Sequence, residues 1–137
     1  MKQITLVTGA GRGIGFAIAK KFAKQGHELV LLVQKKNQIN LLKKKLDRIS
    51  KIKKTYFCGD LRDIVFLKKI DKKVKKINNL INNAAQANTK YFTEVSYSEL
   101  NDLIEVNLKV PFKLSQIFAK KMIKNNIKGC IVNISSQ

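Results

Sequence analysis

Residues 8–15 read Thr8-Gly-Ala-Gly-Arg-Gly-Ile-Gly15 (TGAGRGIG), with a glycine at every second position. A short apolar run at residues 4–7 precedes this stretch, and residues 16–26 follow it with apolar side chains at helical spacing. Glycines between a strand and a helix permit a tight turn, and they let the backbone approach a phosphate. Backbone N–H groups at a helix N-terminus also bind phosphate. The stretch therefore predicts a phosphate-binding turn between a first strand and a first helix.

The rest of the chain alternates apolar runs with amphipathic segments. We expect strands at residues 4–7, 28–33, 53–60, 79–85 and 129–136, and helices at residues 16–26, 37–50, 63–77 and 96–126. Most of the strands are continuously apolar, which is typical of a parallel sheet covered by helices on both faces. The sequence therefore predicts one doubly wound α/β domain over residues 1–137.

The formal net charge of +19 suggests a nucleic acid or an acidic membrane as a partner. The lysine runs at residues 43–45, 51–54 and 68–76, however, lie on different predicted segments and form no single stripe. No aromatic residues are interleaved with them, as a base-stacking platform requires. No apolar run is long enough to span a bilayer, and the N-terminus lacks a signal-peptide pattern. We therefore expect neither nucleic-acid nor membrane binding.

Two cysteines and one histidine limit the possible site chemistry. Cys58 and Cys130 each belong to an apolar run, so we expect buried thiols, no disulfide framework and a reducing cytoplasm. His27 is the only histidine, and the acidic residues are scattered. The sequence therefore predicts no metal site and no nucleophile–histidine pair.

The motifs, in their order along the chain, resemble the N-terminal half of a short-chain dehydrogenase/reductase, and the resemblance covers all 137 residues. It rests on TGAGRGIG at residues 8–15, GDL at 59–61, NNAA at 82–85, VNL at 106–108 and IVNISS at 131–136. The glycines follow the pattern TGxxxGxG, not GxGxxG. The resemblance implies a Rossmann-type fold with strand order 3-2-1-4-5, truncated after the fifth strand. It also implies hydride transfer between a nicotinamide cofactor and a small carbonyl or alcohol substrate, and a homo-oligomer for the full-length form.

Site residues follow from the resemblance position by position. Asp60 matches the aspartate that contacts the adenine ring, Asn107 the active-site asparagine, and Ser136 the catalytic serine that polarises the substrate oxygen. The candidate cofactor-binding residues are Thr8, Gly9, Gly11, Arg12, Gly13, Ile14, Gly15, Lys35, Asp60, Leu61, Asn83, Ala84 and Ala85.

The sequence departs from the family pattern in two ways. Ala85 stands where the family has glycine, which is tolerable if the backbone φ there is negative. The family's Tyr-x-x-x-Lys motif, which supplies the acid/base tyrosine, does not occur after Ser136. We therefore expect a fragment that is inactive alone. The alternatives are a non-catalytic dinucleotide-binding protein and, third, a basic nucleic-acid-binding domain.

The end of the second strand bears on the choice between NAD and NADP. Val33 stands where NAD-dependent members carry an acid for the ribose 2′-hydroxyl, and Lys35 and Lys36 follow it. Arg12 matches a basic position of NADP-preferring members, and arginine is scarce in this chain. The sequence therefore favours NADP over NAD.

The long predicted helix contains two further signals. Ser96 and Glu99 form a capping box at its start. Pro111 has no N–H, so the helical bond to the carbonyl of Asn107 cannot form. The missing bond serves either to kink the helix or to free the Asn107 carbonyl, which the family uses to hold a water in its proton relay. Both effects can occur together.

Overall fold

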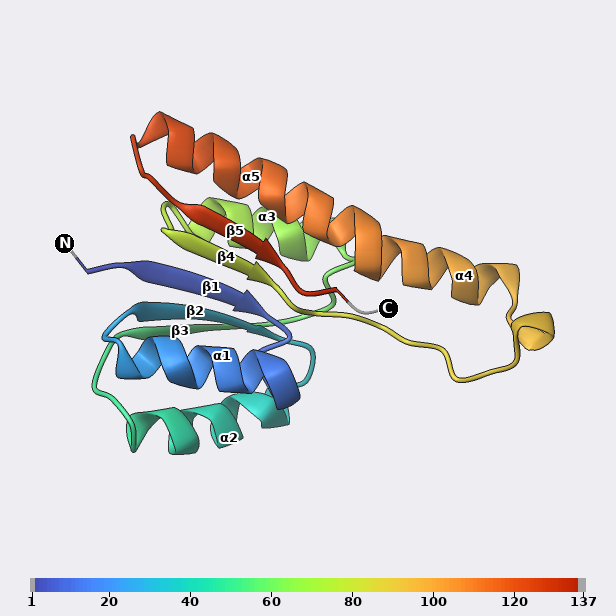
Figure 1. The fold of residues 1–137 in the computed structure, drawn as a ribbon, viewed down its shortest axis with the longest axis horizontal. Coiled ribbons are helices and arrows are strands. Elements are labelled where there is room, and N and C mark those ends of the chain that lie inside the picture. The colour runs from blue at the N-terminus through green and yellow to red at the C-terminus, as the bar shows by residue number, and fades with distance from the viewer. Residues whose placement is uncertain (1, 136–137) are drawn as a thin grey trace.

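The computed structural model describes residues 2–135, so Met1, Ser136 and Gln137 lie outside the described residues (Figure 1). Its five strands are β1 (Ile4–Thr8), β2 (Glu28–Val33), β3 (Lys54–Cys58), β4 (Asn79–Asn82) and β5 (Cys130–Asn133). They form one parallel sheet in the order β3-β2-β1-β4-β5. The doubly wound fold and the strand order expected from the sequence are confirmed.

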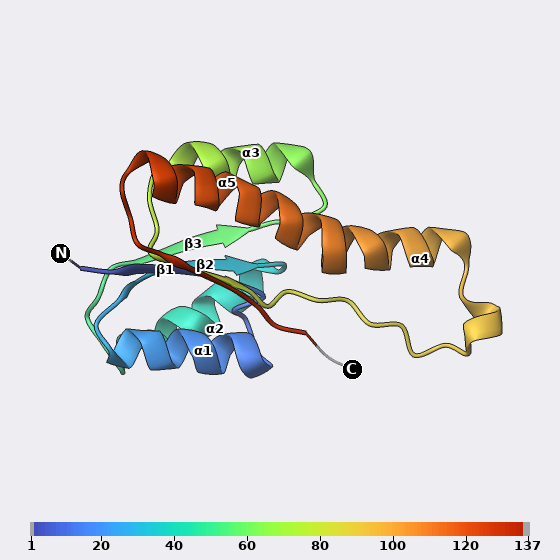
Figure 2. The same cartoon turned by 45° about the horizontal axis from the view of Figure 1, so that its top comes forward.

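Helices cover the sheet on both faces (Figure 2). α1 (Gly13–Lys24) and α2 (Lys36–Asp47) lie on one face, and α3 (Ile64–Lys73) and α5 (Val110–Lys124) lie on the other. Neighbouring strand residues alternate between the two cores: Leu6 packs with α3 and α5, and Val7 packs with α1 and α2. This two-sided burial is why the strands are apolar at nearly every position.

The strands are shorter than the apolar runs predicted. β3 ends at Cys58 instead of residue 60, β4 at Asn82 instead of residue 85, and β5 at Asn133. The polar residues that follow each run therefore lie in loops at the carboxyl ends of the strands, where the backbone is released from the sheet.

The segment predicted as one long helix is divided into three parts. α4 (Tyr97–Ile104) continues into a π-helical turn, η2 (Glu105–Lys109), and then into α5. In η2 the N–H of Val110 bonds to the carbonyl of Glu105, five residues back. Pro111, at the start of α5, cannot donate a backbone bond, which accounts for a change in the bonding pattern here.

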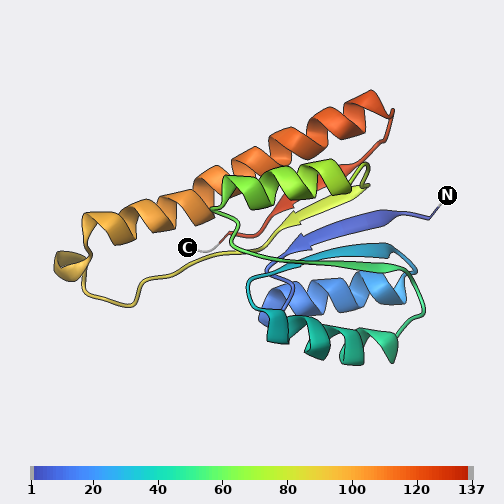
Figure 3. The same cartoon turned by 180° about the vertical axis from the view of Figure 1, so that it is seen from behind.

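α4 projects beyond the sheet, after a long connection from β4 that includes the short 3₁₀ turn η1 (Phe92–Glu94) (Figure 3). None of its eight residues, all of which the structure describes, is buried. The predicted capping box is confirmed: the Ser96 hydroxyl accepts the Glu99 N–H at 3.2 Å, and Glu99 Oε2 accepts the Ser96 N–H at 2.9 Å.

β5 forms one edge of the sheet, and this overturns one expectation. Cys130 is exposed, not buried, because no strand in the described part of the chain flanks β5 on its outer side. Cys58 is half-buried, and its thiol donates to the Gln34 carbonyl at 3.4 Å. The strand order implied by the resemblance had placed this strand at the edge of the sheet, whereas the apolar run by itself predicted a buried Cys130.

The lysine runs are less separate than the sequence suggested. Lys53, just before β3, and Lys73, Lys75 and Lys76, at and after the end of α3, line the same cavity near the start of β2. Within residues 2–135, no helix is both long enough and apolar enough to cross a membrane.

Candidate functional site

The predicted cofactor-binding residues lie at the carboxyl-terminal edge of the sheet. All five strands are parallel, so their carboxyl ends meet there, and the glycine turn, Asp60 and the residues 83–85 each follow one of these ends. In open α/β sheets ligands bind at this edge, where the strand order reverses. Here the order reverses between β1 and β4, the two strands whose ends carry the turn and Asn83.

The glycine turn needs glycine for two separate reasons. Gly9 and Gly13 have φ of +64° and +53°, in the left-handed region that side chains disfavour. A β-carbon on Gly15 would lie 2.3 Å from the carbonyl oxygen of Gly9, so α1 starts in direct contact with the turn. A β-carbon on Gly11 would meet the Gln38 side chain of α2, at 2.5 Å from its nitrogen.

Thr8 joins the glycine turn to the loop after β4. Its buried hydroxyl accepts the N–H groups of Asn83 and Ala84, both at 2.9 Å, and lies 3.4 Å from the Ile81 carbonyl, to which it donates. A hydroxyl oxygen can donate one hydrogen bond and accept two, so the single Thr8 oxygen can serve all three partners. Thr8 therefore fixes two strand ends against each other.

The Asn83 side chain also holds the glycine turn against the loop after β4. Its side-chain nitrogen donates to the carbonyls of Thr8 at 3.1 Å and Gly9 at 3.3 Å, and it lies 2.5 Å from where a β-carbon on Gly15 would be. Ala85 is not among the residues with positive φ within residues 2–135. The alanine that replaces the family glycine is thus accommodated without left-handed strain.

Basic side chains lie around the turn. Arg12 is exposed in extended conformation at the N-cap of α1, and Ile14 beside it is 61% exposed. Lys35 is exposed at the N-cap of α2, where its N–H donates to Gln38 Oε1 at 3.0 Å. Val33, at the end of β2, is buried at 3% exposure, so this strand end places no carboxylate near the turn.

Asp60 is held by a residue that the sequence motifs did not reveal. Arg62 binds both carboxylate oxygens of Asp60, with Nη2 2.7 Å from Oδ2, and its Nη1 lies 2.7 Å from Asp102 on α4. The hydrogen bond from the Arg62 side chain lowers the pKa of Asp60, and the two carboxylates raise the pKa of Arg62. Leu61, between them, packs against the core on the α3 side. No sequence pattern was assigned to Arg62; the scarcity of arginine in the chain is a signal that could have drawn attention to it.

Asn107 lies in the π-helical turn η2 and binds the loop after β4. Its Oδ1 accepts the Gln86 N–H and its Nδ2 donates to the Gln86 carbonyl, both at 2.8 Å. π-helical turns often occur at functional sites. The side chain of the predicted catalytic asparagine is therefore engaged with the residue next to Ala85, whereas Ser136, the predicted catalytic serine, lies outside the described residues.

A second polar cluster lies at the carboxyl end of β4, where Asn82 is the last residue of the strand. Asn82 is 4% exposed, and its Nδ2 contacts Ser115 Oγ of α5 at 3.1 Å and Asn133 Oδ1 of β5 at 2.8 Å. Its Oδ1 is buried without a hydrogen-bond partner among the described residues. The motif at residues 82–85 contains Asn82, but no sequence pattern indicates this cluster, which joins β4, β5 and α5.

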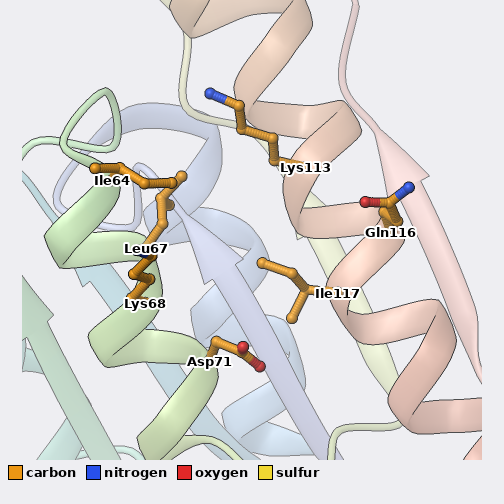
Figure 4. A pocket seen from close by; sticks show the side chains of 7 residues that line it. All are labelled: Ile64, Leu67, Lys68, Asp71, Lys113, Gln116 and Ile117. Carbon is orange, nitrogen blue, oxygen red and sulfur yellow. The ribbon is translucent and has the colours of Figure 1, made fainter.

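A shallow pocket between α3 and α5 is not this site (Figure 4). Apolar Leu67 and Ile117 and charged Lys68, Asp71 and Lys113 line it. No residue of the glycine turn or of the loops after β3 and β4 is among its lining residues. The strand ends, and not this pocket, carry the candidate cofactor site.

Comparison with known proteins gives consistent matches. A family model described as short chain dehydrogenase matches residues 3–137. L-xylulose reductase from Mus musculus is 33% identical over 132 residues, 96% of this chain and 52% of the mouse protein. A short-chain dehydrogenase from Sphingobium yanoikuyae in complex with NADPH has a TM-score of 0.89 at 30% identity, over 98% of this chain and 54% of that one. A metagenomic short-chain oxidoreductase in complex with NADP has a TM-score of 0.90 at 30% identity, over 98% and 62%. The chain thus spans about half the length of the curated relatives it matches.

Proposed function

The chain belongs to the short-chain dehydrogenase family, and on that basis we propose that it binds NADP(H) at the carboxyl edge of its sheet and serves hydride transfer between this cofactor and a small carbonyl or alcohol substrate. The observation that carries the proposal is the glycine turn. Gly9 and Gly13 give the turn its left-handed backbone, and Gly15 lets α1 start directly against it. The exposed backbone at Gly13 therefore lies at the N-terminus of α1, where phosphate binds.

The residues at this edge suit a phosphorylated dinucleotide. We assign the pyrophosphate to the turn at residues 9–15 and the adenine to Asp60 and Leu61. Arg12 and Lys35 are exposed and basic, and the buried Val33 at the end of β2 offers no carboxylate to repel a 2′-phosphate. Two solved family members with the same fold hold NADPH and NADP. These points support NADP over NAD.

Catalytic roles are assigned to two residues. Bound NADPH supplies the hydride. In our proposal the Ser136 hydroxyl donates to the substrate oxygen, which stabilises the negative charge that develops there. Asn107 holds the loop after β4 through its side chain, and its carbonyl, which Pro111 cannot bond as a helix would, holds a water for proton transfer.

The 137 residues contain no Tyr-x-x-x-Lys sequence. We therefore propose that this chain by itself binds the cofactor but reduces no carbonyl compound, since an acid/base group contributes about 10²–10⁴-fold to rate. Turnover of an aldehyde or ketone that depends on Ser136 would contradict this. Such a result would mean that the acid/base group lies elsewhere among these residues.

Hydrogen exchange with and without NADPH tests the binding site. We expect NADPH to slow amide exchange at residues 9–15, in the loop at residues 83–86 and around Asp60, and to leave the cavity near Lys53 and Lys73 unchanged. Protection confined to that cavity, or no protection at saturating NADPH, would contradict the proposal.

A further inference from the structure

Arg62 connects two carboxylates from separate parts of the fold. Its Nε lies 3.1 and 3.0 Å from the two oxygens of Asp60, and its Nη2 lies 2.7 Å from Oδ2. On its other side, Nη1 lies 2.7 Å from Asp102 of α4. All three nitrogens of the guanidinium are therefore engaged, and the planar group is held from both ends.

These contacts limit which further hydrogen bonds the Asp60 carboxylate can accept. Its Oδ1 also accepts the Arg62 backbone N–H, at 2.9 Å. A carboxylate accepts about four hydrogen bonds, and Arg62 alone takes most of that capacity. The Asp60 side chain is 39% exposed, so without Arg62 it would sample several rotamers. Arg62 thus fixes both the orientation of the carboxylate and the direction left for a further donor.

We propose that Arg62 is a positioning residue that aims the Asp60 carboxylate at the 6-amino group of the cofactor's adenine, and so makes the site discriminate for that group. The inference rests on the proposed function, because it requires NADP(H) to bind at this edge of the sheet. A carboxylate that is already ordered gains more binding free energy from a single N–H donor than a mobile one does. Its side-chain entropy has already been lost in the free protein, so binding does not have to order it.

A purely structural role for Arg62 makes a different prediction. Through Asp102 it also ties the loop after β3 to α4, the projecting helix that leads into Asn107. If that tie were the whole function, loss of Arg62 would weaken every cofactor equally, whatever its base.

The test compares NADPH with its reduced hypoxanthine analogue, in which oxygen replaces the adenine 6-amino group. Dissociation constants for both are measured by titration for the wild type and for Arg62→Ala, Arg62→Lys, Asp102→Asn and Arg48→Ala. Arg62→Lys keeps the charge without the planar fork, and it serves as the second variant should Arg62→Ala fail to fold. Arg48→Ala removes one exposed arginine at the C-cap of α2, which precedes β3 whereas Asp60 follows it, and controls for net charge.

We expect the wild type to prefer NADPH by about three- to tenfold, the range of one hydrogen bond. Arg62→Ala and Arg62→Lys should lose that preference through weaker NADPH binding, with analogue binding unchanged within about twofold. Asp102→Asn and Arg48→Ala should keep the preference, since neither removes a contact of Asp60.

Each other outcome overturns the inference. If Arg62→Ala weakened the binding of NADPH and of the analogue equally, only the structural role of Arg62 would remain. If it tightened the binding of NADPH, Arg62 would be blocking access to Asp60. A wild type that binds both cofactors equally well refutes the positioning role and leaves the proposed function standing. A wild type that binds neither refutes both.

Discussion

The carbonyl oxygen of Gly9 lies 2.3 Å from the position that a β-carbon on Gly15 would occupy. The Gly9 carbonyl and Gly15 both belong to the backbone, so neither can move aside as a flexible side chain would. Gly15→Ala should therefore push α1 away from the turn and lower the free energy of unfolding by about 3 kcal/mol or more. Denaturant unfolding measures the change.

Gly11→Ala is the matched control in the same turn. Its β-carbon would meet the end of the Gln38 side chain, which can move aside if it gives up its exposed hydrogen bond to the Lys35 N–H. We expect a loss below about 1 kcal/mol. Equal losses for Gly11→Ala and Gly15→Ala would show that the close packing of α1 on Gly9 is not what requires glycine at position 15.

Thr8→Val tests the contact between the turn and the loop after β4. The variant keeps the shape of the side chain but removes the acceptor of two N–H groups, those of Asn83 and Ala84. An unpaired donor costs about 1–3 kcal/mol when it is fully buried, and these two residues are half-buried, so we expect a loss of about 2 kcal/mol in denaturant unfolding. Thr8→Ser retains the hydroxyl and should retain most of the stability. A Thr8→Val protein as stable as Thr8→Ser would contradict the assignment.

Tyr56→Phe should change how stability depends on alkaline pH. Burial, followed by the nearby Asp47 carboxylate, raises the pKa of Tyr56 from 10.0 to about 12. Between these values the folded protein holds a proton that the unfolded chain has lost, so stability falls as pH rises, by up to about 2–3 kcal/mol. In Tyr56→Phe this part of the loss should vanish.

At neutral pH the same variant should be as stable as the wild type within about 1 kcal/mol, because the Tyr56 hydroxyl is buried without a partner among residues 2–135. Chemical unfolding at pH 7 to 12 compares the two proteins. An identical pH dependence would mean that Tyr56 titrates normally in the fold.

Asn107→Ala should release the loop after β4. The variant removes both 2.8 Å bonds to the Gln86 backbone, so the Gln86 amide should exchange faster. Global stability should change by less than about 1 kcal/mol, because these groups are exposed. Residue-resolved hydrogen exchange measures this, with the amide of Val7 in β1 as the internal reference. Unchanged exchange at Gln86 would show that other contacts hold the loop.

Local constraints made much of this protein predictable from its sequence. The glycine turn was predictable because left-handed φ and close backbone contact act within a few residues. The strands were predictable because burial on both faces demands continuous apolar runs. The capping box of Ser96 and Glu99 is likewise local.

Contacts between distant segments were not predictable in the same way. Arg62 meets Asp102 only because the C-terminal end of α4 lies beside the loop after β3, and no short motif encodes that approach. Cys130 is exposed because β5 lies at the edge of the sheet, a position that the family strand order implied but that the apolar run around Cys130 did not. The π-helical turn before Pro111 is one of several ways a helix can adapt to a missing N–H.

In our proposal the glycine turn, with Arg12 beside it, binds NADP(H). The most direct test is to measure dissociation constants for NADPH and NADH with the wild type and Arg12→Ala. We expect the wild type to bind NADPH at least about tenfold more tightly, and Arg12→Ala to lose most of that margin while its NADH affinity stays within about twofold. Absence of NADPH binding, tighter binding of NADH, or equal losses for both cofactors in Arg12→Ala would contradict the account.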